Sequence, residues 1–291
     1  MKEAFKETRF TLETRRLIVV CNQIINDYLG QGLRLTLRQL YYQLVTRNII
    51  PNQEKMYRML SRVLSDARLA GLVDWSAIED RVRQPRMPNE FRDLDELVQA
   101  AVASYRLPRW RTQTRYVELW VEKDALAGVL QPLAQEFHVT MMVNRGYSSQ
   151  SAMYDSAKRF IREDKQGILF YLGDHDPSGE DMVRDIQDRL DLFGADVDVR
   201  KLALTMAQVE EYEPPPNPAK MSDSRAEQYV RRHGSQSWEV DALPPQVLTQ
   251  IIRAAFRSIV NRRAMQEIVD QERQDKERLQ EALRSLGDSD N

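Results

Sequence analysis

The chain has 291 residues and a formal net charge of −2, with 42% hydrophobic and 30% charged residues, an ordinary balance for a globular protein. Its one cysteine, Cys21, excludes a disulfide framework and a cysteine-based zinc site. No apolar stretch approaches the roughly 20 residues of a membrane span, and the N-terminus lacks the apolar core of a secretory signal. We therefore expect a cytoplasmic protein with no membrane partner.

Charge is unevenly distributed along the chain. Residues 1–115 hold 20 Lys and Arg against 13 Asp and Glu, whereas the remainder holds 22 against 31. A basic N-terminal part followed by an acidic part suits a DNA-reading module joined to a carboxylate-rich catalytic module. A chance imbalance among solvated faces is the alternative.

Three helices are expected in the N-terminal part. Apolar residues recur at three- and four-residue spacing from Thr11 to Leu29, which predicts the first helix. Thr36 with Gln39 forms a capping-box pattern at the start of the second. The third is predicted from about Gln53 to Ala70, and residues 72–78 are expected to form a small strand or wing.

The third helix carries basic residues on its outer side, namely Lys55, Arg58 and Arg62. Two helices, a short turn, a basic helix and a wing occur in the order of a winged helix-turn-helix. In that motif the basic helix enters the major groove while arginines position the phosphates. A helical domain with a solvated basic face is the alternative interpretation.

Two adjacent tyrosines lie on the second predicted helix, about 100° apart around its axis. Tyr41 falls on the apolar face and is expected in the core. Tyr42 falls on the polar face, one turn from Arg38. A tyrosine beside a cation is a candidate nucleophile, and a half-exposed surface tyrosine is the alternative.

Beyond a linker at residues 107–110, strands and helices alternate. This rhythm predicts an α/β domain with a parallel sheet and helices on both faces. The predicted strands are 116–121, 139–143, 167–172 and 197–204, and the predicted helices are 125–137, 149–162 and 178–193. A long helix from about Gln246 follows, and its charge-rich end, from Gln266 to Leu286, is expected to project freely or to pair with another chain. We expect domains at residues 1–108 and 109–243, and a C-terminal helical extension at 244–291.

Acidic residues follow two of the predicted strands. Glu122 comes after the first, and Asp174 and Asp176 come after the third. Carboxyl ends of neighbouring parallel strands meet at the ligand-binding edge of a sheet, so the three acids are expected to gather there around Mg²⁺. His175 is expected to point away as a bystander. Arg145, in a loop at the same edge, is a candidate phosphate ligand or a plain surface charge.

Glu122 and the later run Asp174-His175-Asp176-Pro177-Ser178-Gly179 resemble the Glu…Asp-x-Asp-x-x-Gly pattern of a toprim domain. Toprim is the metal-binding fold shared by topoisomerases, primases and certain nucleases. Upstream, residues 36–42 (Thr-Leu-Arg-Gln-Leu-Tyr-Tyr) resemble the Arg-x-x-Tyr-Tyr motif of the A subunit of type IIB topoisomerases (topoisomerase VI) and of the related meiotic double-strand-break transesterase. The resemblance covers about residues 10–260 and points to short stand-alone relatives on phages and mobile elements.

The resemblance implies a winged-helix domain followed by a toprim domain that cleaves double-stranded DNA. Tyr42 would attack a phosphodiester to give a 5′-phosphotyrosyl link, with Arg38 orienting or activating it. Glu122, Asp174 and Asp176 would hold Mg²⁺. The family's homodimer, in which tyrosine and metal site come from different protomers, is implied as well. Full topoisomerase activity would need a separate ATPase partner, since the chain carries no GHKL-type ATPase.

Two other functions remain open. Some defence proteins resemble the same plan but act as metal-dependent nucleases with water as the nucleophile, in which case Tyr42 is structural. A non-catalytic DNA-binding protein with a lapsed site is the third reading, and the intact set of Glu122, Asp174 and Asp176 argues against it. A primase is disfavoured because no zinc-binding cysteines accompany the acidic motif.

Overall fold

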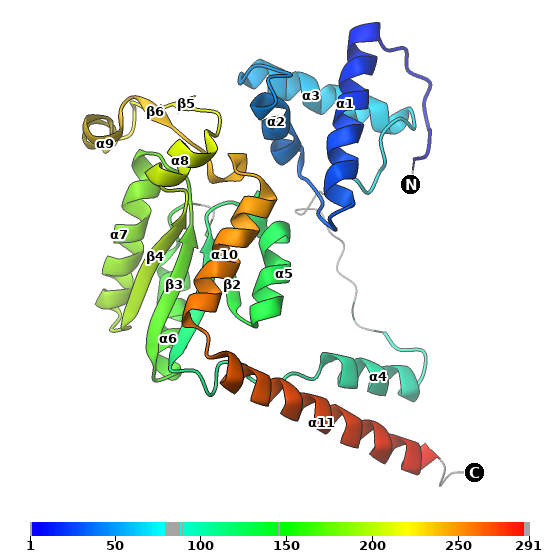
Figure 1. Cartoon of the computed structure of the whole chain (residues 1–291), viewed down its shortest axis with the longest axis vertical. Helices are drawn as coiled ribbons and strands as arrows, with labels where there is room; N and C mark the ends of the chain where they lie inside the picture. Colours follow the sequence, from blue (N-terminus) through cyan, green and yellow to red (C-terminus); the bar gives the residue numbers. More distant parts are fainter. Residues whose placement is uncertain (1, 79–87, 89, 145, 288–291) are drawn as a thin grey trace.

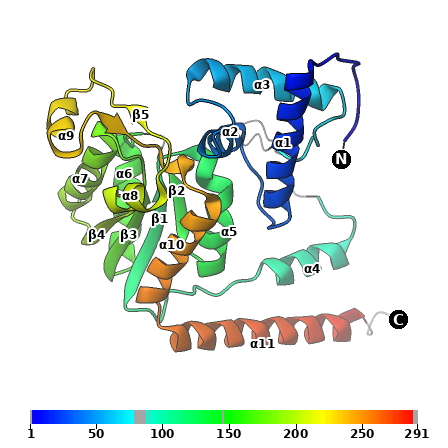
Figure 2. The same cartoon turned by 45° about the horizontal axis from the view of Figure 1, so that its top comes forward.

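The computed structural model describes residues 2–78, 88, 90–144 and 146–287, so the predicted phosphate ligand Arg145 lies outside the described residues. A group of three N-terminal helices lies beside a parallel sheet, and two further helices lie together below both (Figures 1 and 2). Within the described part of the chain, no helix combines the length and the apolar character needed to cross a membrane.

The N-terminal helices begin where the capping residues predict. They are α1 (Leu12–Leu29), α2 (Leu37–Thr46) and α3 (Glu54–Leu69). The Thr11 side chain caps α1, and Thr36 and Gln39 form both hydrogen bonds of the capping box at the start of α2. The apolar sides of the three helices bury one cluster, which includes Ile18, Cys21, Ile24, Leu40, Leu44, Leu60 and Leu64.

The expected wing is not formed by residues 72–78. These residues make turns, and Ile78 forms an isolated parallel bridge with Leu35. Residues 79–87, which follow, lie outside the described residues. The structure therefore shows an α-rich N-terminal part.

Four strands form one parallel sheet in the described part of the chain, in the order β2–β1–β3–β4. The strands are β1 (Arg115–Val121), β2 (Thr140–Val143), β3 (Gln166–Leu172) and β4 (Val197–Ala203). The helices that cover the sheet are α5 (Ala127–Phe137), preceded by the 3₁₀ turn η1 (Asp124–Leu126), α6 (Gln150–Arg162), α7 (Pro177–Leu192) and α10 (Pro245–Ile259). This arrangement confirms the predicted α/β sheet.

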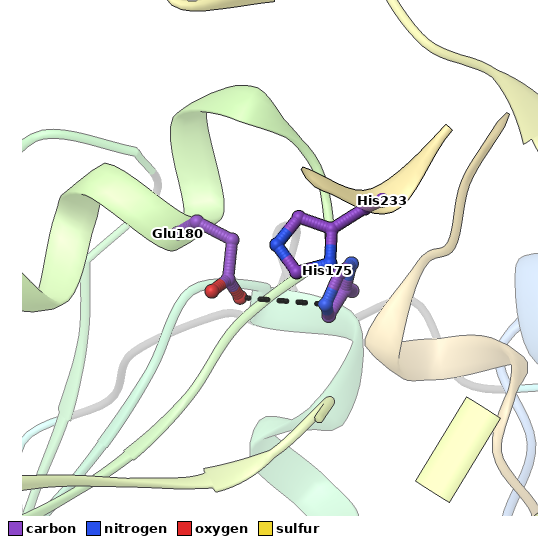
Figure 3. A group of neighbouring side chains, drawn as sticks. All are labelled: His175, Glu180 and His233. Carbon is purple, nitrogen blue, oxygen red and sulfur yellow. Dashed lines mark ion pairs between the residues drawn. The ribbon is translucent and has the colours of Figure 1, made fainter. Parts of the chain in front are cut away.

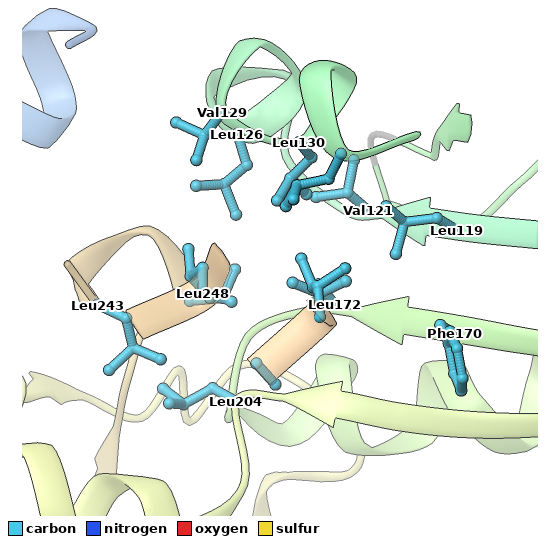
Figure 4. Close-up of a cluster of buried hydrophobic side chains, with 14 of the residues drawn as sticks. Leu119, Val121, Leu126, Val129, Leu130, Phe170, Leu172, Leu204, Leu243 and Leu248 are labelled. Atoms are coloured by element: carbon cyan, nitrogen blue, oxygen red, sulfur yellow. The ribbon is translucent and has the colours of Figure 1, made fainter. Parts of the chain in front are cut away.

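Successive strand residues point to opposite faces of the sheet, and each face has its own core. On one face, α5 and α10 pack on Leu119, Val121, Phe170 and Leu172 (Figure 4). On the other, α6 and α7 pack on Trp120, Leu169 and Tyr171. Helices on both faces explain why the strands read as nearly continuous apolar runs.

A segment of short elements connects β4 to α10 above the sheet (Figure 1). It comprises α8 (Met206–Tyr212), β5 (Asn217–Pro218), α9 (Ala226–His233), β6 (Gln236–Ser237) and the 3₁₀ turn η2 (Val240–Ala242). β5 and β6 pair antiparallel. Asn52, in the turn before α3, donates to the carbonyl of Pro216 at 2.9 Å, so the segment also contacts the N-terminal helices.

The single long helix predicted from about Gln246 is wrong, because the chain forms two helices there. α10 ends at Ile259, and α11 (Arg262–Gly287) begins after Val260 and Asn261. The buried Gln113 side chain bonds both main-chain groups of Asn261, at 2.8 and 3.1 Å, and so satisfies the groups that the break exposes.

The two C-terminal helices also have different surroundings. α10 buries Leu248, Ile252 and Phe256 in the core of the sheet, so it is part of that core and not an extension. α11 packs on α4 (Leu94–Ser104), and its buried Glu272 bonds Arg109 at 3.0 Å.

Glu118 is a buried charge inside the sheet domain. Glu118 on β1 is fully buried on the side of α6, where Arg159 donates to its two oxygens at 2.8 and 2.9 Å. The Trp120 indole and the Tyr116 hydroxyl donate to the same carboxylate at 2.8 and 2.9 Å. A charge buried away from water is tolerated when its hydrogen bonds are met in this way.

Removing the cation of this pair should therefore destabilise the fold. We expect Arg159→Met to lower the free energy of unfolding by about 3 kcal/mol, because Glu118 stays buried without its partner. Denaturant unfolding measures the change. The control Arg184→Met removes exposed ion pairs on α7 and should cost less than about 1 kcal/mol. Equal effects of the two substitutions would contradict the argument.

Candidate metal and nucleophile site

The register of β1 and β3 brings Glu122 and Asp174 to the same edge of the sheet. Val121 pairs with Leu172 in parallel, so strands β1 and β3 end side by side at the same edge of the sheet. The Glu122 amide donates to the carbonyl of Leu172 at 2.8 Å, and the Asp174 amide donates to Oε2 of Glu122 at 3.0 Å. The two acids predicted to be neighbours are thus in direct contact.

Asp174 is buried, and its Oδ1 accepts hydrogen bonds from Nζ of Lys123 and the amide of Val240, both at 2.9 Å. Burial raises the pKa of the Asp174 carboxyl, Lys123 opposes this, and the charge of Glu122 adds to the rise. The ionised form therefore depends on Lys123.

Asp176 begins α7. Its Oδ1 accepts from the Ser178 hydroxyl at 2.9 Å and from the Gly179 amide at 2.6 Å, an N-cap arrangement. Burial raises the pKa of the Tyr171 hydroxyl, and the charges of Glu122, Asp174 and Asp176 raise it further, so this hydroxyl lies near all three.

The three carboxylates offer donors that fit a hard cation. Each keeps one oxygen that makes no hydrogen bond within the described part of the chain: Oε1 of Glu122, Oδ2 of Asp174 and Oδ2 of Asp176. Oxygen ligands of this kind suit Mg²⁺. The acids of the sequence motif thus keep oxygens of the type that a hard cation prefers.

A cluster of five charged side chains, here called the charge cluster, joins α2 to this edge: Arg38, Lys123, Asp174, Glu239 and Asp241. Besides Asp174, Lys123 contacts Glu239 at 2.8 Å and Asp241 at 2.9 Å. Arg38 contacts Glu239 and lies 3.2 Å from Asp241. Burial alone would lower the pKa of Lys123, but the three acids outweigh it and raise that pKa.

Tyr42 is buried, at 4% exposure, although its position on α2 predicted a polar face. The face is covered because η2 packs against it, with Ala242 in the same apolar cluster. The Tyr42 hydroxyl donates to Glu239. Burial raises the pKa of Tyr42, and Glu239 raises it further, while Arg38, 5.9 Å from the ring centre, opposes the rise. Tyr41 is buried, as predicted.

The basic residues of α3 lie where the pattern predicted. Lys55, Arg58 and Arg62 are all exposed, and Arg58 pairs with the exposed Glu54 one turn away. A cavity of about 510 Å³ lies between α2, α3 and the turn after β1, and Arg38, Tyr57 and Ala125 are among the residues that line it. Exposed cations thus lie on the helix beside this opening.

Sequence reasoning missed Glu239, Asp241 and His233. Glu239 and Asp241 lie far along the chain from Arg38 and follow no motif, so nothing in the pattern marked them. His175, predicted to be a bystander, is buried with its ring beside Tyr229 and Trp238.

His175 also belongs to a second group. Its ligand atoms and those of Glu180 and His233 all lie within 4.8 Å of one another (Figure 3). By the same criterion Glu122, Asp174 and Asp176 do not form such a group among the described residues.

Comparison with protein-family models and with curated proteins finds no match for this chain. The motifs and the geometry of their residues therefore carry the functional argument.

The close approach of α7 to the Asp174 main chain requires glycine at position 179. A Cβ there would lie 2.2 Å from the carbonyl oxygen of Asp174. We expect Gly179→Ala to lower the free energy of unfolding by about 2 kcal/mol or more, because backbone must shift. The control Gly30→Ala places its Cβ no closer than 3.3 Å, at φ −61°, and should change stability by less than about 1 kcal/mol. Chemical denaturation of both variants checks this, and no loss for Gly179→Ala would refute it.

Proposed function

We propose that this chain cleaves DNA strands by hydrolysis at the edge formed by β1 and β3, with Mg²⁺ held by Glu122, Asp174 and Asp176. The observation that carries the proposal is the contact of Glu122 with Asp174, each with an oxygen left over for a cation. When bound there, Mg²⁺ would polarise a phosphodiester and lower the pKa of a water molecule.

The surrounding residues supply orientation and binding. Lys123 and the Val240 amide fix Asp174, and the Asp174 amide fixes Glu122. Exposed Lys55, Arg58 and Arg62 on α3 would position the phosphates of double-stranded DNA without reading its sequence.

The surroundings of Tyr42 favour water as the nucleophile. An attacking phenol must reach the phosphorus and lose its proton. Tyr42 is almost fully buried, its hydroxyl donates to Glu239, and its pKa is raised by burial and by that carboxylate. In this arrangement Tyr42 is a positioning residue that orients Glu239 within the charge cluster.

Transesterification by Tyr42 is the second candidate function. It is favoured by the chain of contacts from Tyr42 through Glu239 and Lys123 to Asp174, and by Arg38 beside the tyrosine ring. In this candidate, the charge cluster opens before Tyr42 attacks. A homodimer and a separate ATPase partner belong to this candidate through the topoisomerase resemblance.

Cleavage of supercoiled plasmid separates the candidates. With Mg²⁺, we expect nicked or linear product and no protein on the DNA ends after a detergent quench. Glu122→Gln should reduce the rate by roughly 100-fold or more, because a metal ligand is lost. Tyr42→Phe should cost less than about tenfold, and the control Glu136→Gln on α5 should leave the rate unchanged.

A covalent adduct that disappears with Tyr42→Phe would instead establish the transesterase. DNA binding without cleavage under any of these conditions would contradict both candidates and would indicate a non-catalytic DNA-binding protein.

Salt dependence tests the role of α3. The slope of log K against log salt is negative, and each lost phosphate contact lowers its magnitude by about 0.9. We expect the triple variant Lys55→Ala, Arg58→Ala, Arg62→Ala to lower this magnitude by about 3, uniformly over DNA sequences. Fluorescence anisotropy with a labelled duplex measures it, with Arg263→Ala on α11, 91% exposed, as the control. An unchanged slope would place the DNA contacts elsewhere.

A further inference from the structure

Three side chains from separate segments form what we call the histidine cluster: His175, Glu180 and His233. They come from the loop after β3, the first turn of α7 and the last residue of α9, and they point toward one another (Figure 3). Their ligand atoms all lie within 4.8 Å of one another. The ring centres of the two histidines are 4.8 Å apart, with the planes at 86°.

The tautomer of His175 follows from Tyr229. The Tyr229 hydroxyl lies 2.9 Å from the carbonyl of His175 and 3.0 Å from that of Gln236. Both carbonyls only accept, so the one hydroxyl proton points to them, and the hydroxyl oxygen accepts from Nδ1 of His175 at 2.8 Å. Nδ1 therefore carries the ring proton, and Nε2 presents its lone pair.

Among the described residues, no group donates a hydrogen bond to that lone pair. Nε2 makes no hydrogen bond within the described part of the chain and lies 3.9 Å from Oε1 of Glu180, beyond hydrogen-bond distance. A neutral imidazole nitrogen and a carboxylate oxygen are both acceptors. His175 as a whole is 2% exposed. The arrangement suits a cation between the acceptors.

We propose that the histidine cluster binds a transition-metal dication of the zinc type, through Nε2 of His175, a ring nitrogen of His233 and the Glu180 carboxylate. Two imidazoles and one carboxylate suit zinc, with a fourth position for water, whereas Mg²⁺ prefers oxygen ligands alone. Bonds of about 2.0–2.1 Å place tetrahedral ligand atoms roughly 3.4 Å apart, so the cluster needs only a small contraction. Nothing in this proposal depends on DNA cleavage.

Neighbouring groups support the ligands in two ways. Tyr229 orients the His175 ring, the usual role of an outer partner of a metal-bound histidine. Lys201 donates to Oε1 of Glu180 at 2.6 Å and to the carbonyl of Asp174 at 2.7 Å. It holds Glu180 through Oε1, the oxygen that lies 3.9 Å from Nε2 of His175, so an ion would compete with this lysine or share the carboxylate with it, and the lysine charge weakens binding. The ion would tie α9 to the loop that carries Asp174 and Asp176.

Calorimetric titration of the chelator-treated full chain with ZnCl₂, without Mg²⁺, tests the proposal. We expect one Zn²⁺ per chain. Affinity should fall by roughly 100-fold for His233→Gln, which removes a ligand, and by roughly tenfold for Tyr229→Phe, which keeps the ring and removes the hydroxyl. His138→Asn changes the remaining histidine of the sequence and should bind like the original chain.

Glu122→Gln separates this site from the proposed catalytic one. Retained zinc binding in Glu122→Gln together with its loss in His233→Gln supports the histidine cluster, whether or not the chain cleaves DNA. Loss in Glu122→Gln with retention in His233→Gln would place the ion among the carboxylates and overturn the proposal. Absence of zinc binding by the original chain would overturn it as well. So would a zinc affinity equal to that of the original chain in both folded variants, His233→Gln and Tyr229→Phe. Circular dichroism of each variant establishes that it is folded.

Discussion

The charge cluster of Arg38, Lys123, Asp174, Glu239 and Asp241 holds the N-terminal helices against the sheet. Asp241 has no exposed side-chain surface, and Lys123 has little. Moving such charges out of water is unfavourable unless each meets an opposite charge. Moving α2 away would take Arg38 from Glu239 and Asp241 and would leave Lys123 as the cation that these two acids contact. The cluster thus disfavours separation of the two parts.

This constraint links the two candidate nucleophiles. Glu122 at the sheet edge is partly exposed, whereas Tyr42 is held through Glu239, which Arg38 and Lys123 also bind. Burial would raise the pKa of Glu239, but Lys123 and Arg38 lower it to about 2, so Glu239 is a weak base for the tyrosine proton. An attack by Tyr42 would therefore first have to break its hydrogen bond to Glu239.

Local patterns in the sequence predicted the local structure. The capping box at Thr36 forms as its residues indicate, because this cap depends only on two residues three positions apart. Long-range partners could not be predicted this way. The burial of Tyr42 depends on η2, about 200 residues later, and the helix break at Asn261 depends on Gln113. Helical periodicity assigns faces but cannot say which distant segment will cover a polar one.

The segment from Asp174 to Glu180 combines these requirements. His175 pairs with Trp238 through both main-chain groups, at 2.8 and 2.9 Å, which fixes its backbone and directs its side chain toward α9. Asp174 reaches Lys123 and Glu122 instead, and Asp176 caps α7. Carboxylates and imidazoles from one short segment are thus sorted into two donor sets. Because hard and borderline cations prefer different donors, the two proposed sites would select different ions even though their ligands are adjacent in sequence.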